Sequence, residues 1–228
     1  MGHFNWKDAA EVEWDKRADF WHERSRKMWE TGSRSDIIPF VQKHVKKGSR
    51  VLDVGCGDGY GSYLLHQAEF KVTGIDLSTE MLTHAKRSLP EEEITFEKAD
   101  VNELPFPDKS FDALLAINVL EWTEGPFHAL KEMVRVTNGE GFLCIGVLGP
   151  TAGPRINSFP RLHGEKAICN TMMPWELEKL AKHLGLQRID DVGVYKKEVQ
   201  PEEAAHLPLE LKQALSFMWV YLFKKEEN

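Results

Sequence analysis

The residues with the clearest chemical potential are a run of glycines and the carboxylates on either side of it. The stretch VLDVGCGDGYGS, residues 51–62, places alternating glycines directly after apolar and β-branched residues. Between a strand and a helix, such glycines allow the backbone to approach a bound nucleotide closely. We therefore predict that Gly55, Gly57 and Gly59 form a ligand-binding turn, the alternative being a tight turn that is merely rich in glycine.

Four acids indicate which ligand this turn would accept. Asp76 ends the next predicted strand, where a carboxylate can accept hydrogen bonds from ribose hydroxyls. Asp100 ends the third predicted strand, where it can accept from an adenine amino group. Asp53 and Asp58 lie beside or within the glycine run, an arrangement that disfavours a pyrophosphate and tolerates a cationic ligand. The pattern predicts an adenosyl ligand, with a nicotinamide dehydrogenase as an alternative.

A parallel sheet would bring these residues together, and the chain accordingly alternates between predicted strands and predicted helices. Apolar runs predict strands at 50–55, 71–76, 94–100, 111–119, 142–149, 186–197 and 216–225. Helical spacing predicts helices at 61–68, 78–89, 126–137, 175–185 and 201–215, with Ser78 as an N-cap. Strands this continuously apolar suit a sheet covered by helices on both faces. We therefore predict a doubly wound α/β fold.

The remaining segments complete the predicted organisation. Two helices are expected before the sheet, over 8–30 and 35–46, the second ending near Gly48. Residues 138–141 predict a turn, and 150–174 have little periodicity, as is typical of a functional loop. We expect one domain over 1–228, in which 1–46 form a helical lid, 47–195 the cofactor-binding core, and 196–228 a C-terminal helix and the last strand.

Composition restricts the class of protein. The 29 basic and 36 acidic residues give a formal net charge of −7, which argues against nucleic acid as a partner. No apolar run approaches the roughly 20 residues of a membrane span, and the N-terminus lacks the order of a signal peptide. Cys56, Cys144 and Cys169 form neither a pair motif nor a metal spacing. A cytoplasmic protein with no metal and no membrane span is expected.

Four stretches together resemble the class I S-adenosylmethionine-dependent methyltransferases. They are VLDVGCGDGYGS, GIDLSTEMLTHAKR, KADVNELPFPDKSFDALLAINVLEW and ALKEMVRVTNGEGFLCIGV, in that order and spacing. More narrowly, they are similar to the small-molecule group that includes the ubiquinone/menaquinone-biosynthesis methyltransferases. The resemblance covers about residues 45–195. It implies a Rossmann-like sheet of seven strands with the last one antiparallel, and S-adenosylmethionine as the cofactor, with S-adenosylhomocysteine as its product.

The resemblance also implies cofactor-binding roles for individual residues. Asp53 would orient the methionine end through the glycine loop. The residues expected to line the cofactor at this end are Gly55, Cys56, Gly57 and Asn118. At the adenosine end, Asp76 would hold the ribose hydroxyls and Asp100 would accept from the adenine amino group. The residues expected to pack around the adenine are Leu77, Met81 and Val101.

The expected substrate side is aromatic. The stretch WDKRADFW, residues 14–21, resembles the lid helix of many relatives, which would place Trp14 and Trp21 near the sulfonium or the substrate. Trp122 follows the fourth predicted strand and would suit a partly apolar acceptor. Simple packing on the apolar face of a helix explains Trp14 and Trp21 equally well.

The chemistry requires few catalytic groups. Methyl transfer from a sulfonium is an in-line displacement, so a base is needed only where the acceptor must lose a proton. His163 in the long loop is the candidate base, with an exposed loop histidine as the alternative. The fourth predicted strand ends in INVLEW, without the Asn/Asp-Pro-Pro-aromatic motif of enzymes that methylate amino groups of nucleic acids. A small-molecule acceptor is therefore predicted. The alternative is a non-catalytic adenosyl-binding scaffold with the same fold.

Overall fold

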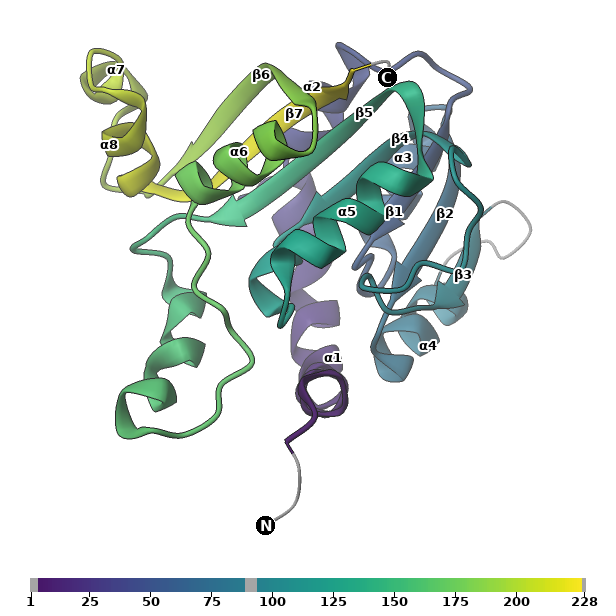
Figure 1. Ribbon diagram of the computed structural model, residues 1–228, viewed down its shortest axis with the longest axis horizontal. Coiled ribbons are helices and arrows are strands. Elements are labelled where there is room, and N and C mark those ends of the chain that lie inside the picture. Colours follow the sequence, from purple (N-terminus) through teal and green to yellow (C-terminus); the bar gives the residue numbers. More distant parts are fainter. Residues whose placement is uncertain (1–3, 89–93, 227–228) are drawn as a thin grey trace.

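The computed structural model describes residues 4–88 and 94–226, whose strands form one seven-stranded sheet (Figure 1). The strands are β1 (Arg50–Val54), β2 (Lys71–Asp76), β3 (Thr95–Lys98), β4 (Phe111–Ile117), β5 (Thr137–Leu148), β6 (Leu186–Tyr195) and β7 (Ser216–Lys225). Their order is β3-β2-β1-β4-β5-β7-β6. The first five run parallel, and β7 is antiparallel to both β5 and β6. The predicted doubly wound α/β fold with an antiparallel last strand is confirmed.

Helices cover both faces of this sheet. They are α1 (Trp6–Glu30), α2 (Ile37–Gln42), α3 (Tyr60–Gln67), α4 (Thr79–Ser88), α5 (Pro126–Val136), α6 (Pro174–His183), α7 (Pro201–Ala204) and α8 (Leu209–Ala214). Two 3₁₀ helices, η1 (Leu120–Trp122) and η2 (Gly153–His163), follow β4 and β5. One buried cluster joins α2, α3 and α4 to the sheet, and a second joins α5 and α6 to the opposite face.

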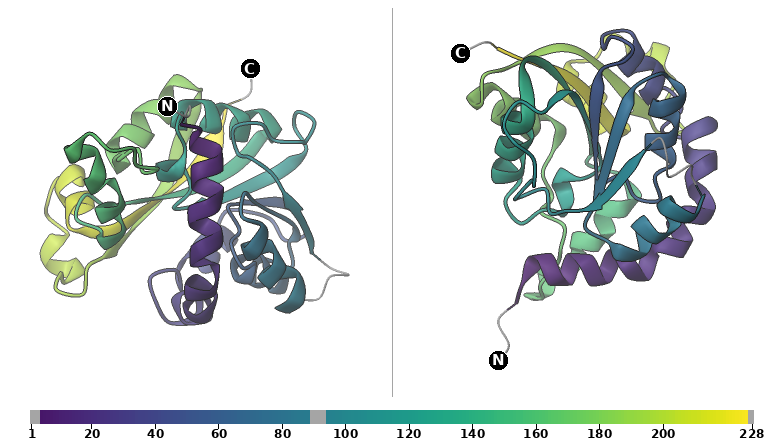
Figure 2. Two further views of the ribbon diagram at one scale, coloured as in Figure 1. Left: turned by 90° about the horizontal axis from the view of Figure 1, so that it is seen from below. Right: turned by 90° about the vertical axis from the view of Figure 1, so that its right-hand side faces the viewer.

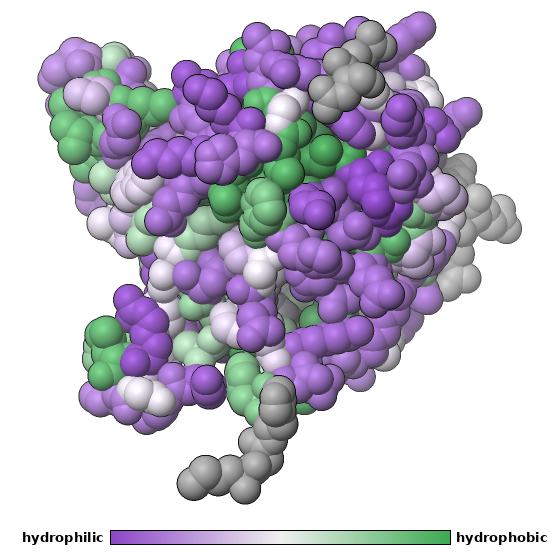
Figure 3. Space-filling model, in the orientation of Figure 1, coloured by the Kyte–Doolittle hydropathy of each residue, from purple (hydrophilic) through white to green (hydrophobic). Residues whose placement is uncertain are grey.

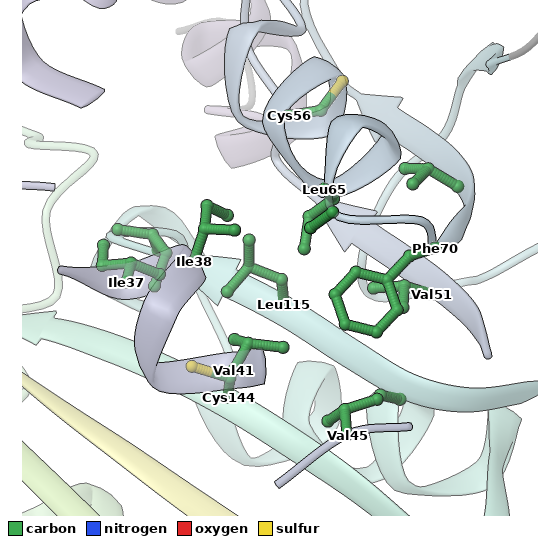
Figure 4. Close-up of a cluster of buried hydrophobic side chains, with 14 of the residues drawn as sticks. Ile37, Ile38, Val41, Val45, Val51, Cys56, Leu65, Phe70, Leu115 and Cys144 are labelled. Carbon is green, nitrogen blue, oxygen red and sulfur yellow. The ribbon is translucent and has the colours of Figure 1, made fainter. Parts of the chain in front are cut away.

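The alternation of side chains along each strand explains why both clusters are apolar. Val51 packs in the cluster under α2 and α3, whereas its neighbour Leu52 packs in the cluster under α5. Leu115 and Leu114 divide between the faces in the same way. Figure 4 shows the first cluster, in which Val51 and Leu115 point toward the helical side chains. A strand buried on both faces must therefore be apolar along its whole length.

Several predicted boundaries differ from the structure. The predicted turn at 138–141 is instead an irregularity inside β5, because Phe111 pairs with Thr137 while Ala113 already pairs with Phe142. The predicted helix over 35–46 is shortened to α2, and the one over 201–215 is divided into α7 and α8, with Pro208 as the N-cap of α8. The predicted helix over 78–89 is α4, and residue 89 lies outside the described residues, as do residues 1–3, 227 and 228 at the ends of the predicted domain.

The long helix α1 lies across the rest of the molecule and against α4 (Figure 2). Asp15 Oδ1 accepts hydrogen bonds from Ser78 Oγ at 2.6 Å and from the backbone N–H of Glu80 at 3.2 Å. Ser78 Oγ in turn accepts from the backbone N–H of Met81, so Ser78 is the predicted N-cap of α4. His84 of α4 contacts Asp19 of α1 at 2.8 Å. The N-terminal helix is thus attached to the start of α4.

The segment predicted to be irregular, 150–174, contains η2, which projects from the body of the molecule (Figure 1). Ile156, Phe159 and Leu162 are 69%, 50% and 66% exposed. Figure 3 shows hydrophobic colour at the tip of this projection and a hollow between it and the main body. Within 4–88 and 94–226, no helix combines the length and apolar character that a membrane span requires.

Candidate active site

A cavity of about 530 Å³ lies at the carboxyl ends of β1, β2 and β4, where α1 covers the sheet. This volume is within the range of small-molecule sites, and the carboxyl edge of a parallel sheet is where such sites form. The predicted residues that line it are Trp14, Trp21, Gly55, Cys56, Gly57, Asp76, Leu77, Met81, Asp100, Val101, Asn118 and Trp122. Three other predicted residues, Asp53, Gly59 and His163, do not line it.

The glycine loop forms one wall of the cavity and depends on left-handed backbone. Gly55 and Gly57 have φ of +66° and +57°. A Cβ on Gly55 would lie 2.6 Å from Cγ2 of Val119, which follows β4, whereas one on Gly57 would meet only Met81 Sδ at 3.8 Å. Gly55 is therefore required for both conformation and space. The loop leaves backbone exposed to the cavity, as the sequence predicted.

Asp76 ends β2 with both carboxylate oxygens held by backbone. The N–H of Gly57 donates to Oδ2 and that of Ser78 to Oδ1, each at 2.8 Å. Burial raises the pKa of Asp76, while these two hydrogen bonds oppose that rise. Each carboxylate oxygen can accept a further hydrogen bond. Asp76 is thus fixed in orientation and can accept from a vicinal pair of hydroxyls.

Asp100 lies at the corresponding position after β3. Its Oδ1 accepts from the backbone N–H and the Nδ2 of Asn102, each at 2.9 Å. Lys7 of α1 approaches Oδ2 at 3.7 Å, so the N-terminal helix contacts this end of the cavity. Oδ2 accepts no hydrogen bond among the described residues. Asp100 therefore retains an acceptor for an amino group.

Asp53 lies under the glycine loop rather than in the cavity. It is 4% exposed, and Ser62 Oγ of α3 donates to its Oδ2 at 2.6 Å. Burial raises the pKa of Asp53 to about 7, against the opposing effects of Ser62 and of the charge on Arg34. This bond joins β1 to α3 across the loop, so any effect of Asp53 on a ligand passes through the loop.

Asp58, inside the glycine run, connects the loop to α1. Ser25 Oγ donates to its Oδ1 at 2.7 Å, and His22 Nδ1 lies 2.9 Å from its Oδ2. The His22 ring also stacks on the ring of His84 in α4, with centroids 4.2 Å apart. The loop is therefore held from the lid side by α1 as well as from below by Asp53.

Asn118 and Glu121 follow β4, and Glu121 lies within η1. Asn118 lines the cavity with φ of +57°. Glu121 is fully buried, and its Oε1 accepts from the backbone N–H of Leu148 and from Asn118 Nδ2, the latter at 3.4 Å. Burial raises the pKa of Glu121. Glu121 could not be identified from the amino-acid sequence, because the sequence does not distinguish a buried glutamate from an exposed one.

The three predicted tryptophans form an aromatic wall. The Trp14 and Trp122 rings meet edge to face with centroids 5.1 Å apart, and Trp21 lies 6.3 Å from Trp14. Trp6 Nε1 donates to the backbone oxygen of Trp122 at 2.7 Å, which fixes α1 to η1. The rings contact one another and also line the cavity. The same residues can therefore pack together and contact a ligand.

His163, the predicted base, gains no geometric support. It is exposed at the end of η2, with its ring 5.4 Å from that of Phe159. The reason is that η2 projects from the body of the molecule, so that Pro154 near its start lines the cavity while His163 at its end does not. His128, at the start of α5, lines the cavity instead. Its place after the β4 loop was the signal that could have identified it.

The cavity fits an adenosyl ligand that carries a sulfonium. Asp76 and Asp100 offer acceptors at the ends of neighbouring strands, and the glycine loop leaves backbone open between α1 and β4. Among the described residues, the lining carboxylates of Asp58, Asp76, Asp100 and Glu124 outnumber the cations of Lys7 and Arg34, which favours a positively charged group. No group of His, Cys, Asp and Glu in the described part of the chain could hold a metal ion.

Comparison with known proteins agrees with this geometry. Residues 52–145 match a family model described as a methyltransferase domain. The chain is 30% identical over 180 residues to the biotin biosynthesis bifunctional protein of Teredinibacter turnerae, covering 72% of this chain and 31% of that protein. It is 41% identical over 108 residues to the demethylmenaquinone methyltransferase of Renibacterium salmoninarum, covering 47% and 45%. The chain thus spans less than half the length of these relatives.

A solved structure shares the fold over nearly the whole chain. It is the complex between the Trm112 methyltransferase activator of Haloferax volcanii and the putative methyltransferase, matched with a TM-score of 0.69 and 18% identity. The match covers 94% of this chain and 98% of that one. At this identity the likeness concerns the fold, and it includes the N-terminal and C-terminal parts that the family model does not reach.

Proposed function

We propose, from the membership of residues 52–145 in the methyltransferase domain family, that the protein is an S-adenosylmethionine-dependent methyltransferase acting on a small, partly apolar metabolite. The observation that carries the proposal is the placement of Asp76 and Asp100 at the ends of adjacent strands, on one cavity with the open glycine loop. When bound, S-adenosylmethionine supplies an electrophilic methyl group on a good leaving group. The residues that would hold it are Gly55, Cys56, Gly57, Asp76, Leu77, Met81, Asp100, Val101 and Asn118.

The chain's own contribution is to position the reactants and to exclude water from them. Positioning two reactants can contribute up to roughly 7–11 kcal/mol to the lowering of a barrier. Here Asp76 is fixed by two backbone N–H groups, and the glycine loop is held by Ser25 from above and by Asp53 and Ser62 from below. Trp14 and Trp21 close the lid side. A rigid wall of this kind would hold the cofactor in place with little reorganisation.

The acceptor side of the cavity supports a partly apolar substrate. Trp14, Trp21 and Trp122 line it together with Leu148, Met28 and Phe217. Aromatic rings also stabilise a neighbouring cation by about 0.5–2 kcal/mol, so the tryptophans suit the sulfonium as well. One relative is named for demethylmenaquinone, an acceptor of the kind that such a wall would accommodate. We propose a metabolite with an apolar ring or chain.

If the acceptor must lose a proton, the histidine available at the cavity among the described residues is His128. We expect His128→Ala to lower turnover on such an acceptor by about 10²- to 10⁴-fold and to change the pH profile, because a positioned base contributes that much. His163→Ala is the matched control and leaves both unchanged. If His163→Ala changed the pH profile and His128→Ala did not, the base would lie on η2.

The three cysteines support a reducing compartment, and we propose the cytoplasm. Cys56, Cys144 and Cys169 are free and buried. Burial raises the pKa of each thiol, so none is a reactive thiolate.

The deciding experiment combines binding with transfer. Calorimetry with S-adenosylhomocysteine and with NAD should give binding of the former alone, and binding of NAD instead would favour a dehydrogenase. Methyl-labelled S-adenosylmethionine is then incubated with a fractionated metabolite extract, and we expect label in one small-molecule fraction. Cofactor binding without transfer to any fraction would favour the non-catalytic scaffold. No binding of S-adenosylhomocysteine at millimolar concentration would overturn the proposal.

A further inference from the structure

The 3₁₀ helix η2 exposes apolar side chains and buries polar ones. A 3₁₀ helix has three residues per turn, so residues three apart lie in one row along it. The outward row, which we call the apolar row, consists of Ile156, Phe159 and Leu162, each at least 50% exposed. The inward row begins with Arg155 and Ser158, which are buried. Single exposed apolar side chains are ordinary, whereas a row of them on a projecting element indicates a binding surface.

The inward row fixes the direction of the apolar row. Arg155 Nε donates to the backbone oxygen of Gly149 at 2.7 Å, and its Nη2 donates to the backbone oxygens of Leu148 and Met172. Ser158 Oγ donates to the backbone oxygen of Arg155 at 2.8 Å. These bonds attach η2 to the end of β5. The apolar row therefore faces outward because the fold holds the opposite side of η2 in place.

The charge of this segment differs from the charge of the chain as a whole. Residues 150–174 contain three basic residues and one acidic residue, in a chain with 29 basic and 36 acidic residues. Arg161, His163 and Lys166 are exposed at the end of the apolar row, and the acidic residue is Glu165. An apolar surface bordered by basic side chains is typical of elements that lie on anionic lipid.

A second projection, formed by α7 and α8, provides the comparison (Figure 1). It also carries exposed leucines, among them Leu211 at 51%, and Figure 3 shows hydrophobic colour on both projections. Residues 201–215, however, contain three glutamates and one lysine. An anionic surface would repel this tip. Of these two projections, η2 is the one whose charge suits anionic lipid.

The shape of η2 favours a lipid surface over a second protein. Three side chains at a convex tip cover far less than the roughly 800 Å² per partner of a stable protein interface. A projecting tip can instead enter the surface of a bilayer while the rest of the protein stays in water (Figure 1). The formal net charge of −7 works against broad contact with anionic lipid, so the contact would be confined to this tip.

We propose that η2 docks the protein reversibly on an anionic lipid surface. The apolar row enters the lipid, and Arg161 and Lys166 contact the headgroups. The docking is reversible because three apolar side chains and two cations form a weak anchor. Raised salt weakens it, since the headgroup contacts are exposed to solvent.

Docking at η2 would bring the cavity to the lipid. Pro154, near the start of η2, lines the cavity. Asn157 Oδ1 accepts from Arg17 Nη2 of α1 at 2.9 Å, so η2 is also attached to the helix that covers the cavity. An apolar acceptor of the proposed kind dissolves in lipid, and docking places the cavity where that acceptor is concentrated. This consequence rests on the proposed function, whereas the docking itself does not.

The test measures partition of the protein between solution and vesicles, without cofactor. One set of vesicles contains phosphatidylglycerol and phosphatidylcholine in equal parts, and the other contains phosphatidylcholine alone. We expect the wild type to bind the anionic vesicles at least about 10-fold more tightly, and about 0.5 M salt to remove this difference. Leu162→Ser should weaken binding to the anionic vesicles by about 10-fold, because it removes a side chain that the lipid buries. Arg161→Gln should weaken it by about fivefold on the anionic vesicles alone.

Leu211→Ser is the matched control, because it removes an exposed leucine from the acidic projection. It should leave both partition coefficients unchanged, and all three variants should keep the Tm of the wild type, since they replace exposed residues. Absence of wild-type binding to the anionic vesicles, or equal weakening by Leu162→Ser and Leu211→Ser, would overturn the proposal. So would a dimer in sedimentation velocity that Leu162→Ser dissociates, because a second copy would then cover the apolar row. Because the vesicle assay uses no cofactor, its failure is distinct from failure of the proposed methyl transfer.

Discussion

At the scale of single residues, a carboxylate at the carboxyl end of a strand has a different role from one near the start of a strand. The first can bind a ligand, and the second holds the structure together. Asp76 is at the carboxyl end of β2 and lines the cavity. Asp112 is near the start of β4, where it accepts from the backbone N–H of Arg50 at 2.8 Å and pairs with the Arg50 side chain. These contacts lower the pKa of Asp112. Asp76 thus faces the cavity at the carboxyl ends of the strands, whereas Asp112 stabilises the opposite end of the sheet.

This contrast gives a matched pair of substitutions. Asp76→Ala should weaken S-adenosylhomocysteine by about 10- to 100-fold, because it removes the charged acceptor for the ribose hydroxyls. Asp112→Ala should leave that affinity unchanged and lower the free energy of unfolding by about 1–2 kcal/mol, since it leaves the N–H of Arg50 unpaired. Calorimetry and urea unfolding measure the two effects. An affinity loss in Asp112→Ala that equals the loss in Asp76→Ala would contradict this division.

Asp53 predicts a dependence of stability on pH. Its pKa rises from an ordinary 3.8 to about 7 on folding, so between these values the folded state holds a proton that the unfolded state has released. The free energy of unfolding should therefore fall as the pH rises from about 4 to 7, by up to about 4 kcal/mol from this group. Asp53→Asn cannot ionise and can still accept from Ser62, so its stability should fall less over this range. Urea unfolding at pH 5, 6.5 and 8 checks this, and parallel curves for the two proteins would argue against it.

The sequence predicts residues whose positions follow from a local pattern. Asp76 and Asp100 end apolar strands, and parallel strands bring their carboxyl ends to one edge. Arg34, which also lines the cavity, could not be predicted, because it lies in a polar turn between α1 and α2 that has no periodicity. His163 was misplaced for the related reason that no periodicity fixes how the segment over 150–174 folds. Contacts that depend on tertiary packing cannot be predicted from the local amino-acid sequence.

At the scale of elements, α1 is attached to the sheet through polar contacts at several points. Asp15 caps the start of α4 through Ser78 and Glu80, and Ser25 donates to Asp58 of the glycine loop. Farther toward its N-terminus, Glu11 pairs with Lys98 at the end of β3. The predicted lid helix is confirmed as a helix, and its contacts place it along the wall of the cavity.

Two acids of α1, one helical turn apart, test how the lid is held. Asp15→Ala removes an acceptor shared by two donors and should lower the free energy of unfolding by about 1–2 kcal/mol. It should also speed hydrogen exchange in α1 relative to the sheet. Asp19→Ala removes the contact between Asp19 and His84, in which the Asp19 side chain is 92% exposed. Because the contact is exposed, this substitution should change the free energy of unfolding by less than about 1 kcal/mol. Equal effects of the two variants would show that Asp15 does not hold the helix.

At the scale of the whole molecule, the sheet connects the helical lid, the cofactor-binding core and the C-terminal part that the sequence predicts. Strands β1, β4 and β5 contribute side chains to both buried clusters, and β7 pairs between β5 and β6. The lid contributes Trp29, Ile37 and Val41 to the first cluster. Because these clusters are shared between the parts of the described chain, we propose that it folds as a single domain.

Calorimetry should accordingly show one cooperative transition, with equal calorimetric and van't Hoff enthalpies. S-adenosylhomocysteine at 100 times its dissociation constant should stabilise the folded state by about 2.7 kcal/mol, which raises Tm by roughly 5–10 °C for a domain of this size. Equimolar NAD serves as the control and should not shift Tm. Two transitions, of which the ligand shifts one, would show that the lid or the C-terminal part unfolds separately.

The attachment of α1 has a consequence for how the protein is made. The helix leaves the ribosome before every residue that it packs against, since its hydrogen bonds and ion pairs reach Asp58, Ser78, Lys98 and Asp100. Trp6 finds its acceptor on Trp122, 116 residues later. Until that point is synthesised, the tryptophan face of α1 has no surface to cover, and nascent chains are exposed to aggregation there. The part of the cavity wall that α1 supplies is therefore synthesised before the residues that it contacts, and it docks only after they have been made.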